Sequence, residues 1–306
     1  MSLKLLRTCL SLLLAGSLFA QNAPSRPRIL GIAHVAIYVS DLNQARAFYK
    51  DFLGFAEPFS VHRQNGADWI GFIKMNDQQY VELFAETAGL AGQLNHIALY
   101  TDDAAGMRAY LASRGVAIVD ELHQGRTGDM FFSVRDPDGN LMEIVQYQTN
   151  SWTGQNKGKF LPESRISSHL SDVGVPVASI PIALNFYRDI LGFKLITQDT
   201  GSGTRPAWVD IRVAEGTDYV QLNVIEGTPA ASTWKAASHM GLTVADAEKS
   251  LADLQSRTAD ASYFRSTAVQ IGREQKPMAQ LSDRDGVRID LRETGTAAGR
   301  AAVVKK

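Results

Sequence analysis

One sequence pattern occurs four times along this chain, and it constrains the fold more than any other feature. The run from His34 to Val39 (HVAIYV) returns as the run from His96 to Thr101 (HIALYT), and again near Asp172 and His239. These short β-branched runs are typical of strands, and each is followed by a polar cap, a helical segment and further strand-like sequence. The sequence therefore predicts an α+β fold built from four βαβββ units.

The second half of the chain repeats the first closely enough to pair the units two by two. Residues 185–193 (NFYRDILGF) repeat residues 47–55 (AFYKDFLGF), and the turn sequence DRDG at 283–286 matches DPDG at 136–139. In the first half we predict helices from Asp41 to Phe52 and from Asp103 to Arg114. Each is expected to end at a glycine, Gly54 or Gly115, because glycine commonly caps the helix carboxyl end.

These repeats set the predicted domain boundaries. Residues 30–148 form a first domain and residues 169–294 a second one. Residues 149–168 are rich in Ser, Gly, Lys and Asn and read as a linker, whereas residues 295–306 form a Gly- and Ala-rich tail that we expect to be flexible.

The first 20 residues predict a signal peptide rather than part of the fold. Lys4 and Arg7 give a positive start, and an apolar stretch runs from Cys9 to Ala20. The stretch is short for a membrane span, which takes about 20 apolar residues. We expect cleavage after Ala20 and a secreted or periplasmic protein without a membrane anchor. An uncleaved anchor is the alternative, because Leu18 stands where a small residue is preferred.

The charge and the cysteine content limit which classes of partner and metal site this chain can have. The chain has 31 Lys and Arg against 32 Asp and Glu, so it offers no excess positive field for nucleic acid. It has one cysteine, Cys9, which excludes a disulfide framework and cysteine-rich zinc sites. A metal site would need histidines and carboxylates. We expect a small-molecule substrate, and the sequence is also compatible with a homodimer.

The pattern resembles the vicinal oxygen chelate (VOC) superfamily, which includes glyoxalase I, methylmalonyl-CoA epimerase, extradiol dioxygenases and bleomycin-resistance proteins. The resemblance covers nearly all of residues 30–294 and is strongest at residues 34–55 and 131–147. It implies two VOC (glyoxalase-like) domains. In each, two βαβββ units pair into a cup-shaped sheet, and metal ligands on the first and last strands meet inside the cup.

Carried over residue by residue, the resemblance implies one metal site in the first domain. Its ligands are His34, Glu82, His96 and Glu143, two imidazoles and two carboxylates that suit a divalent Fe, Mn, Ni, Co or Zn ion. Both glutamates stand among apolar strand residues, where an unpaired carboxylate is costly to bury and a shared cation would compensate it.

The second domain is predicted to have lost this site. The equivalent residues are Asp172, Gln221, His239 and Asp290, which retain one imidazole, shorten two ligands and replace a carboxylate by an amide. Because aspartate is one methylene shorter than glutamate, the same backbone would leave a gap at the metal. We expect a degenerate half, with a weak site for a hard ion as the alternative.

For the reaction, the resemblance leaves three alternatives. Four ligands favour a glyoxalase- or epimerase-like lyase or isomerase, in which Glu82 or Glu143 is the general base. An extradiol ring-cleaving dioxygenase needs only His34, His96 and Glu143, but Ser133 replaces the tyrosine of that branch's signature. A bleomycin-resistance-like protein would sequester a ligand without catalysis.

Some further side chains are weaker candidates for contact with a substrate: Tyr100, His123, Arg126 and Tyr147. The aromatic pairs Phe48-Tyr49 and Phe186-Tyr187 lie at helical spacing to leucines, and we interpret them as core residues.

Overall fold

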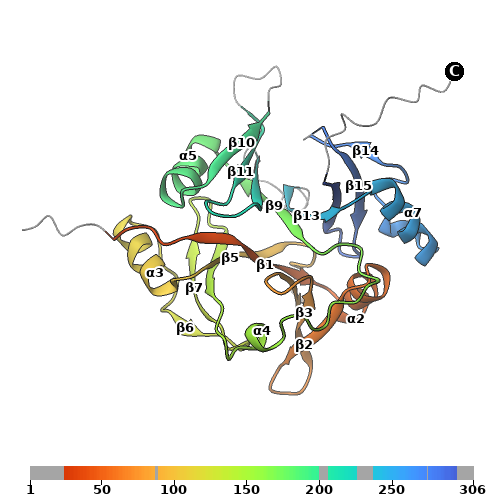
Figure 1. The fold of residues 1–306 in the computed structure, drawn as a ribbon, viewed down its shortest axis with the longest axis horizontal. Helices are drawn as coiled ribbons and strands as arrows, with labels where there is room; N and C mark the ends of the chain where they lie inside the picture. Colours follow the sequence, from red (N-terminus) through yellow and green to blue (C-terminus); the bar gives the residue numbers. More distant parts are fainter. Residues whose placement is uncertain (1–23, 87–88, 200–205, 226–236, 274, 295–306) are drawn as a thin grey trace, which may run out of the picture.

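The computed structural model describes residues 24–86, 89–199, 206–225, 237–273 and 275–294. The predicted signal peptide, the predicted tail and the start of the sequence before residue 24 lie outside the described residues. Two eight-stranded sheets dominate the fold, one from each half of the chain (Figure 1). The α+β prediction of four βαβββ units in two domains is confirmed.

The first sheet has the strand order β2-β3-β4-β1-β5-β8-β7-β6, so β1 and β5 pair at its centre and join the two units. β1 runs parallel to β4 and antiparallel to β5, and β5 runs parallel to β8. The strands are β1 (Ile29–Val39), β2 (Ala56–His62), β3 (Asp68–Lys74), β4 (Tyr80–Ala85), β5 (Leu94–Thr101), β6 (His123–Gln124), β7 (Met130–Arg135) and β8 (Leu141–Gln146).

The second sheet repeats this topology in the order β10-β11-β12-β9-β13-β16-β15-β14. Its central pair is β9 and β13, the counterparts of β1 and β5. The strands are β9 (Leu170–Val177), β10 (Lys194–Gln198), β11 (Trp208–Arg212), β12 (Tyr219–Val224), β13 (His239–Val244), β14 (Gln270–Ile271), β15 (Pro277–Ser282) and β16 (Arg288–Glu293).

The helices follow the strands at the predicted places. In the first unit, α2 (Leu42–Arg46) continues directly into a π-helical segment, η1 (Ala47–Phe52). In the third unit, α5 (Ile180–Leu184) continues into η2 (Asn185–Ile190) in the same way. Other helices in the described residues are α3 (Ala104–Ser113), α4 (Trp152–Gln155), α7 (Ala247–Arg257) and the 3₁₀ turn η3 (Ala261–Tyr263).

Caps at both ends explain where the helices begin and end. Asp41 accepts hydrogen bonds from the backbone N–H groups of Asn43 and Gln44, and Asp103 accepts one from Gly106. Gly54 and Gly115 have φ angles of +82° and +75°, the left-handed conformation that glycine adopts at least cost. The predicted glycine stops are therefore confirmed.

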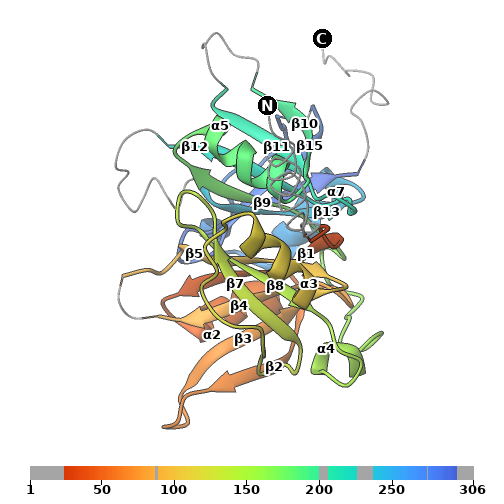
Figure 2. The ribbon, with the colours of Figure 1, turned by 90° about the vertical axis from the view of Figure 1, so that its left-hand side faces the viewer.

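The two halves pack against each other, and Figure 2 shows the second half stacked on the first. One continuous cluster of buried apolar side chains includes residues of both halves. Polar contacts complete the interface: the Gln79 amide donates to the Leu170 carbonyl (2.9 Å) and accepts from the Leu170 N–H (3.0 Å). Asn140 donates to the Pro176 carbonyl (2.9 Å).

The segment between the two sheets is packed against the first half. The Lys74 ammonium donates to the carbonyls of Asn156 (2.5 Å) and Lys159 (2.9 Å), and Trp152 N–H donates to the Thr127 carbonyl (2.7 Å). Ser151 and Thr153 are buried. These bonds hold the connection in one path across the surface of the first half.

No helix in the described part of the chain is both long and apolar enough to cross a membrane.

Candidate metal centre

The pairing register of the first sheet brings the four predicted ligands to one face. One row across the sheet reads Tyr80, His34, Ala98 and Glu143, and the next reads Glu82, Ala36 and His96. Because side chains two residues apart on a strand share a face, both rows point to the same side. The small Ala36 and Ala98 stand between the ligands and leave room for the longer side chains to converge.

The ligand atoms of the four residues lie close together. The two imidazole Nε2 atoms are 2.9 Å apart. His34 Nε2 lies 3.5 Å from a Glu143 oxygen and 3.6 Å from a Glu82 oxygen. His96 Nε2 lies 3.6 Å from Glu143 and 3.8 Å from Glu82. Within the described residues, His34, His96 and Glu143 form a set whose ligand atoms all lie within 4.8 Å of one another.

Burial sets the protonation of these groups. It lowers the imidazole pKa to about 3 for His34 and to about 4 for His96, so both rings are neutral near pH 7. Burial raises the carboxyl pKa of Glu82 well above its ordinary range, and repulsion from Glu143 adds to the effect. Burial also raises the pKa of Glu143. A site that disfavours carboxylate charge in this way is stabilised by a bound cation.

The donor set fits a divalent transition metal. The His96 Nδ1 atom lies 3.0 Å from the Asn95 amide oxygen, which makes Nδ1 the donor and leaves the Nε2 lone pair facing the site. Two nitrogens each about 2.0–2.1 Å from one ion and at right angles would lie about 2.9 Å apart. The observed Nε2 separation matches that value. His34, Glu82, His96 and Glu143 would hold the ion.

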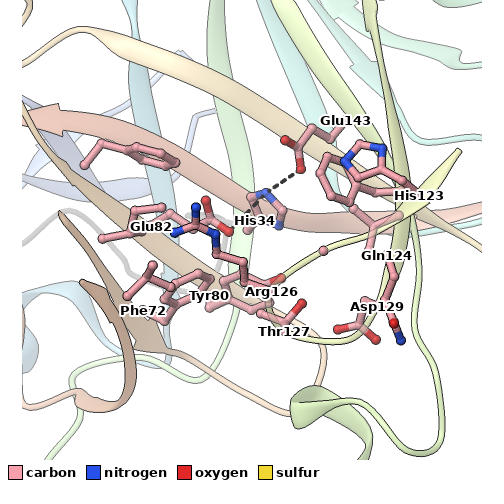
Figure 3. Close-up of a pocket in the computed structure, with 16 residues that line it drawn as sticks. His34, Phe72, Tyr80, Glu82, His123, Gln124, Arg126, Thr127, Asp129 and Glu143 are labelled. Carbon is pink, nitrogen blue, oxygen red and sulfur yellow. Dashed lines mark ion pairs between the residues drawn. The ribbon is translucent and has the colours of Figure 1, made fainter. Parts of the chain in front are cut away.

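A cavity of about 300 Å³ opens next to this cluster. Figure 3 shows His34 and Glu143 pointing toward each other inside it, with His123 and Gln124 on one side and Glu82 and Tyr80 on the other. The walls are largely apolar, formed by Val61, Ile70, Phe72, Phe84, Phe131 and Val145. The site therefore combines a charged end with an apolar chamber of small-molecule size.

The weaker sequence candidates separate into two groups. His123 and Arg126 line the cavity. Tyr147 donates to the Gln78 carbonyl (2.5 Å), and its ring packs at a tilt against Tyr100, with 5.5 Å between the ring centres. Tyr100 lines a different cavity between the two halves. Sequence reasoning missed Tyr80, whose ring stacks on the His34 imidazole at 4.8 Å. Its signal was the motif Tyr-Val-Glu-Leu, which returns as Tyr-Val-Gln-Leu at 219–222. In it Tyr80 precedes Glu82 by two residues and so shares its face.

The second sheet places Asp172, Gln221, His239 and Asp290 at the equivalent register positions. There Asp172, His239 and Asp290 are engaged in polar contacts within the protein. Asp172 and His239 lie 3.2 Å apart. Arg292, which no sequence motif singles out, contacts Asp172 (3.1 Å) and Asp290 (3.0 Å). Burial opposes ionisation of Asp172, yet the Arg292 guanidinium keeps its carboxyl pKa well below the ordinary range. A guanidinium thus supplies the positive charge among these carboxylates.

Glycine explains how these shorter side chains come together. Gly174 and Gly241 occupy the positions of Ala36 and Ala98. A Cβ atom on Gly241 would lie 1.7 Å from an Asp172 oxygen, and one on Gly174 would lie 2.1 Å from His239 Nδ1. The side chains therefore lie directly over the backbone of the sheet, in space that alanine methyl groups occupy in the first half.

Comparison with known proteins finds relatives in sequence. Among curated proteins, the uncharacterized protein YaeR of Escherichia coli (strain K12) is 30% identical over 122 residues, which cover 38% of this chain and 95% of YaeR. Metapyrocatechase 2 of Cupriavidus necator is 26% identical over 196 residues, which cover 58% of this chain and 57% of that protein.

Solved structures share the two-domain fold. The 2,3-dioxygenase LapB from Pseudomonas sp. KL28 superposes with a TM-score of 0.67 at 14% identity, covering 89% of this chain and 94% of LapB. The Mn(II)-bound glyoxalase from Novosphingobium aromaticivorans gives 0.65 at 17% identity, covering 87% and 83%. At these identities the likeness concerns the fold alone.

The family model for the Glyoxalase/Bleomycin resistance protein/Dioxygenase superfamily matches residues 31–144 and 169–291, one match on each sheet. These matches cover most of the chain and agree with the topology of both halves. The chain therefore belongs to the glyoxalase/bleomycin resistance protein/dioxygenase superfamily.

Proposed function

We propose that this protein is a metal-dependent enzyme that acts on a small substrate with two neighbouring oxygens, as a glyoxalase- or epimerase-like lyase or isomerase. The observation that carries this proposal is the convergence of two neutral imidazoles, one buried carboxylate and one half-buried carboxylate at the end of a largely apolar cavity. A divalent ion held by His34, Glu82, His96 and Glu143 would supply electrophilic stabilisation to the substrate oxygens.

Glu82 is the better of the two glutamates for proton transfer. Both glutamates line the cavity, but the compact set whose ligand atoms lie within 4.8 Å of one another includes Glu143 and not Glu82. Burial raises the pKa of Glu82, and a carboxylate of higher pKa is a stronger base. We assign Glu82 the role of general base that removes and returns a substrate proton, and Glu143 the role of permanent ligand.

The other residues hold the substrate and exclude water. The Tyr80 ring packs on His34 and fixes its orientation. The aromatic walls at Phe72, Phe84 and Phe131 favour an apolar substrate body, because they remove its surface from water.

The test is Glu82→Gln. An amide oxygen still coordinates a metal but does not accept a proton, so bound metal should persist while solvent-deuterium exchange into the substrate falls by about 10²–10⁴-fold. Glu143→Gln is the matched comparison: its amide oxygen also coordinates, so bound metal should persist and exchange should fall far less. Substrates come from a screen of dicarbonyls, 2-oxoacid thioesters and catechols. Full exchange activity in Glu82→Gln would contradict the assignment.

Extradiol ring cleavage is the second candidate, and specific observations favour it. His34, His96 and Glu143 alone supply a two-histidine, one-carboxylate set, and His123 lines the same cavity. Metapyrocatechase 2 and LapB are relatives in sequence and in fold, respectively. In this case Glu82→Gln should retain most oxygen uptake with a catechol. Measuring oxygen uptake and deuterium exchange on the same variant therefore separates the two reactions.

A further inference from the structure

We propose that Arg126 binds an anionic group of the substrate at the mouth of the metal cavity. The substrate would then be a small carboxylate or similar anion with an apolar body and two chelating oxygens at the opposite end. This inference rests on the proposed metal-dependent function and specifies the class of its substrate.

The loop that carries Arg126 is built as a rigid turn. The Gly125 N–H donates to the Asp129 carbonyl (2.8 Å), and the Gly128 N–H donates back to the Gly125 carbonyl (3.0 Å). The Asp129 carboxylate accepts from the Gln148 N–H and the Thr153 hydroxyl, both at 2.8 Å. The guanidinium is thus presented from a fixed backbone, which reduces the entropy lost when it binds a ligand.

Arg126 lines the cavity and extends over it from this loop (Figure 3). Its guanidinium carbon lies 4.5 Å from the centre of the Trp69 ring. Among the described residues, no side chain or carbonyl accepts a hydrogen bond from it and no carboxylate pairs with it. A stacked guanidinium keeps its edge free, and that edge presents paired N–H donors whose geometry matches a carboxylate.

The second half contains a similar arginine stacked on a tryptophan, but there the guanidinium N–H groups have hydrogen-bond partners. Arg273 is the counterpart of Arg126, since each follows the glycine after the short strand, and it stacks on Trp208 as Arg126 stacks on Trp69. There the guanidinium lies 3.3 Å from the Gln221 side-chain oxygen and 3.2 Å from that of Asn223. Gln221 is the counterpart of Glu82. An arginine at this loop position therefore reaches the strand that carries a ligand, and in the first half it has no such partner.

The rest of the cavity limits what the anion can be attached to. Among the described residues that line it, Arg126 is the only arginine or lysine, and the walls are largely apolar. A volume of about 300 Å³ admits a single aromatic ring or a short aliphatic chain with its polar ends. The metal cluster and Arg126 supply charged contacts, His123, Gln124, Thr127 and Asp129 add further polar groups, and the aromatic and aliphatic side chains supply the apolar surface.

The test uses two hydroxamates, which chelate a metal through two neighbouring oxygens whatever the native reaction. Benzohydroxamate is neutral away from the metal, and 4-carboxybenzohydroxamate adds a carboxylate on the far side of the ring. Both are titrated calorimetrically into the full-length protein loaded with Zn²⁺, which has no redox chemistry. Metal content is measured on each sample first.

We expect the wild-type protein to bind 4-carboxybenzohydroxamate about tenfold more tightly than benzohydroxamate. This gain in affinity lies between that expected from an exposed ion pair and that expected from a charge-assisted hydrogen bond in a pocket. Arg126→Gln should abolish this preference and leave zinc content and the affinity for benzohydroxamate within about twofold. Arg63→Gln removes the other arginine over Trp69, and Arg273→Gln removes the counterpart in the second half; both should keep the preference.

Two results would overturn the proposal: equal binding of both probes by the wild-type protein, or a preference that survives in Arg126→Gln. A protein that takes up no zinc, or that binds neither hydroxamate when loaded, contradicts the proposed metal function instead. Raising NaCl from 50 to 500 mM should weaken the preference, since the contact lies at the exposed mouth.

Discussion

The hydroxyl group of Tyr187, in the second half, donates a hydrogen bond of 3.0 Å to the carboxylate of Asp136 in the first half. The reciprocal bond runs from Tyr49 of the first half to Asp283 of the second, at 3.3 Å. Each tyrosine belongs to a repeated Phe-Tyr pair and each aspartate opens a repeated Asp-x-Asp-Gly turn. The two halves therefore meet as the subunits of a symmetric dimer do, through the same surface on each.

Tyr187→Phe should lower the free energy of unfolding by about 0.5–1.5 kcal/mol, because it removes one buried hydrogen bond and leaves the Asp136 oxygen without that donor. Urea denaturation measures the change. In a double-mutant cycle, Asp136→Asn should be less harmful in the Tyr187→Phe background than in the wild-type protein. Strictly additive effects would show that the two side chains do not interact.

Stability should depend on pH through Asp283. Burial raises its carboxyl pKa to about 7, against an ordinary value of 3.8. Between these values the folded state holds a proton that the unfolded chain releases, so the free energy of unfolding falls as pH rises from about 4 to about 7. Asp283→Asn does not ionise and should lose this dependence.

Relative to the wild-type protein, Asp283→Asn should therefore gain stability from pH 5 to pH 8, by about 2 kcal/mol, since one pKa unit corresponds to about 1.4 kcal/mol. Urea denaturation at both pH values checks this. Parallel stability profiles for the two proteins would show that Asp283 is ionised throughout.

Metal should bind in the first half. His96→Ala removes a ligand whose loss leaves Glu82 and Glu143 poorly compensated, and we expect metal affinity to fall by more than about 100-fold. His239→Ala, at the equivalent position of the second half, should leave the metal stoichiometry unchanged. Elemental analysis of the purified proteins gives the answer, and the opposite result would place the site in the second half.

Features of the fold that depend on local sequence patterns could be predicted, whereas contacts between residues far apart in the sequence could not. Strand alternation and the repeats predicted the units and their pairing, because alternation along a strand is a local property. The convergence of His34, Glu82, His96 and Glu143 was implied by the resemblance to the VOC superfamily. The Phe-Tyr pairs were interpreted as core residues only, since the partners of Tyr49 and Tyr187 lie 234 and 51 residues away. The π-helical form of residues 47–52 also has no local signal.

The ion pairs around Arg292 in the second sheet were the other feature that could not be predicted from the sequence. The replacements at Asp172, Gln221 and Asp290 indicated a lost site, but nothing in the sequence singles out Arg292 as the cation that takes its place. Its role depends on the fold, which brings the carboxylates of Asp172 and Asp290 from two strands to its guanidinium group. The glycines at 174 and 241 carried a signal, because they stand where the first half has alanine.

Gly241→Ala should test that arrangement. Its methyl group would lie 1.7 Å from Asp172, which is fully buried and held by His239 and Arg292, so we expect a loss of about 1–3 kcal/mol. Ala98→Gly, the reverse exchange in the first half, should cost no more than about 1 kcal/mol through backbone entropy. Thermal unfolding compares them, and a well-tolerated Gly241→Ala would contradict the close packing over this strand.

The mature amino terminus should be Gln21. The charged start at Lys4 and Arg7 and the apolar stretch to Ala20 favour export and cleavage. Amino-terminal sequencing or intact-mass measurement of protein recovered from its native compartment checks this. Retention of Met1 on a protein found in the cytoplasm would contradict it.

The packed connection between the two sheets has a consequence for how this protein behaves on dilution. Two separate subunits joined through the same surface would come apart as their concentration falls, and the buried faces would open to water. Here the partner surface is attached by a segment fixed through Lys74 and Trp152, so its local concentration is set by the tether rather than by the cell. The metal half should therefore keep its shape at nanomolar protein levels.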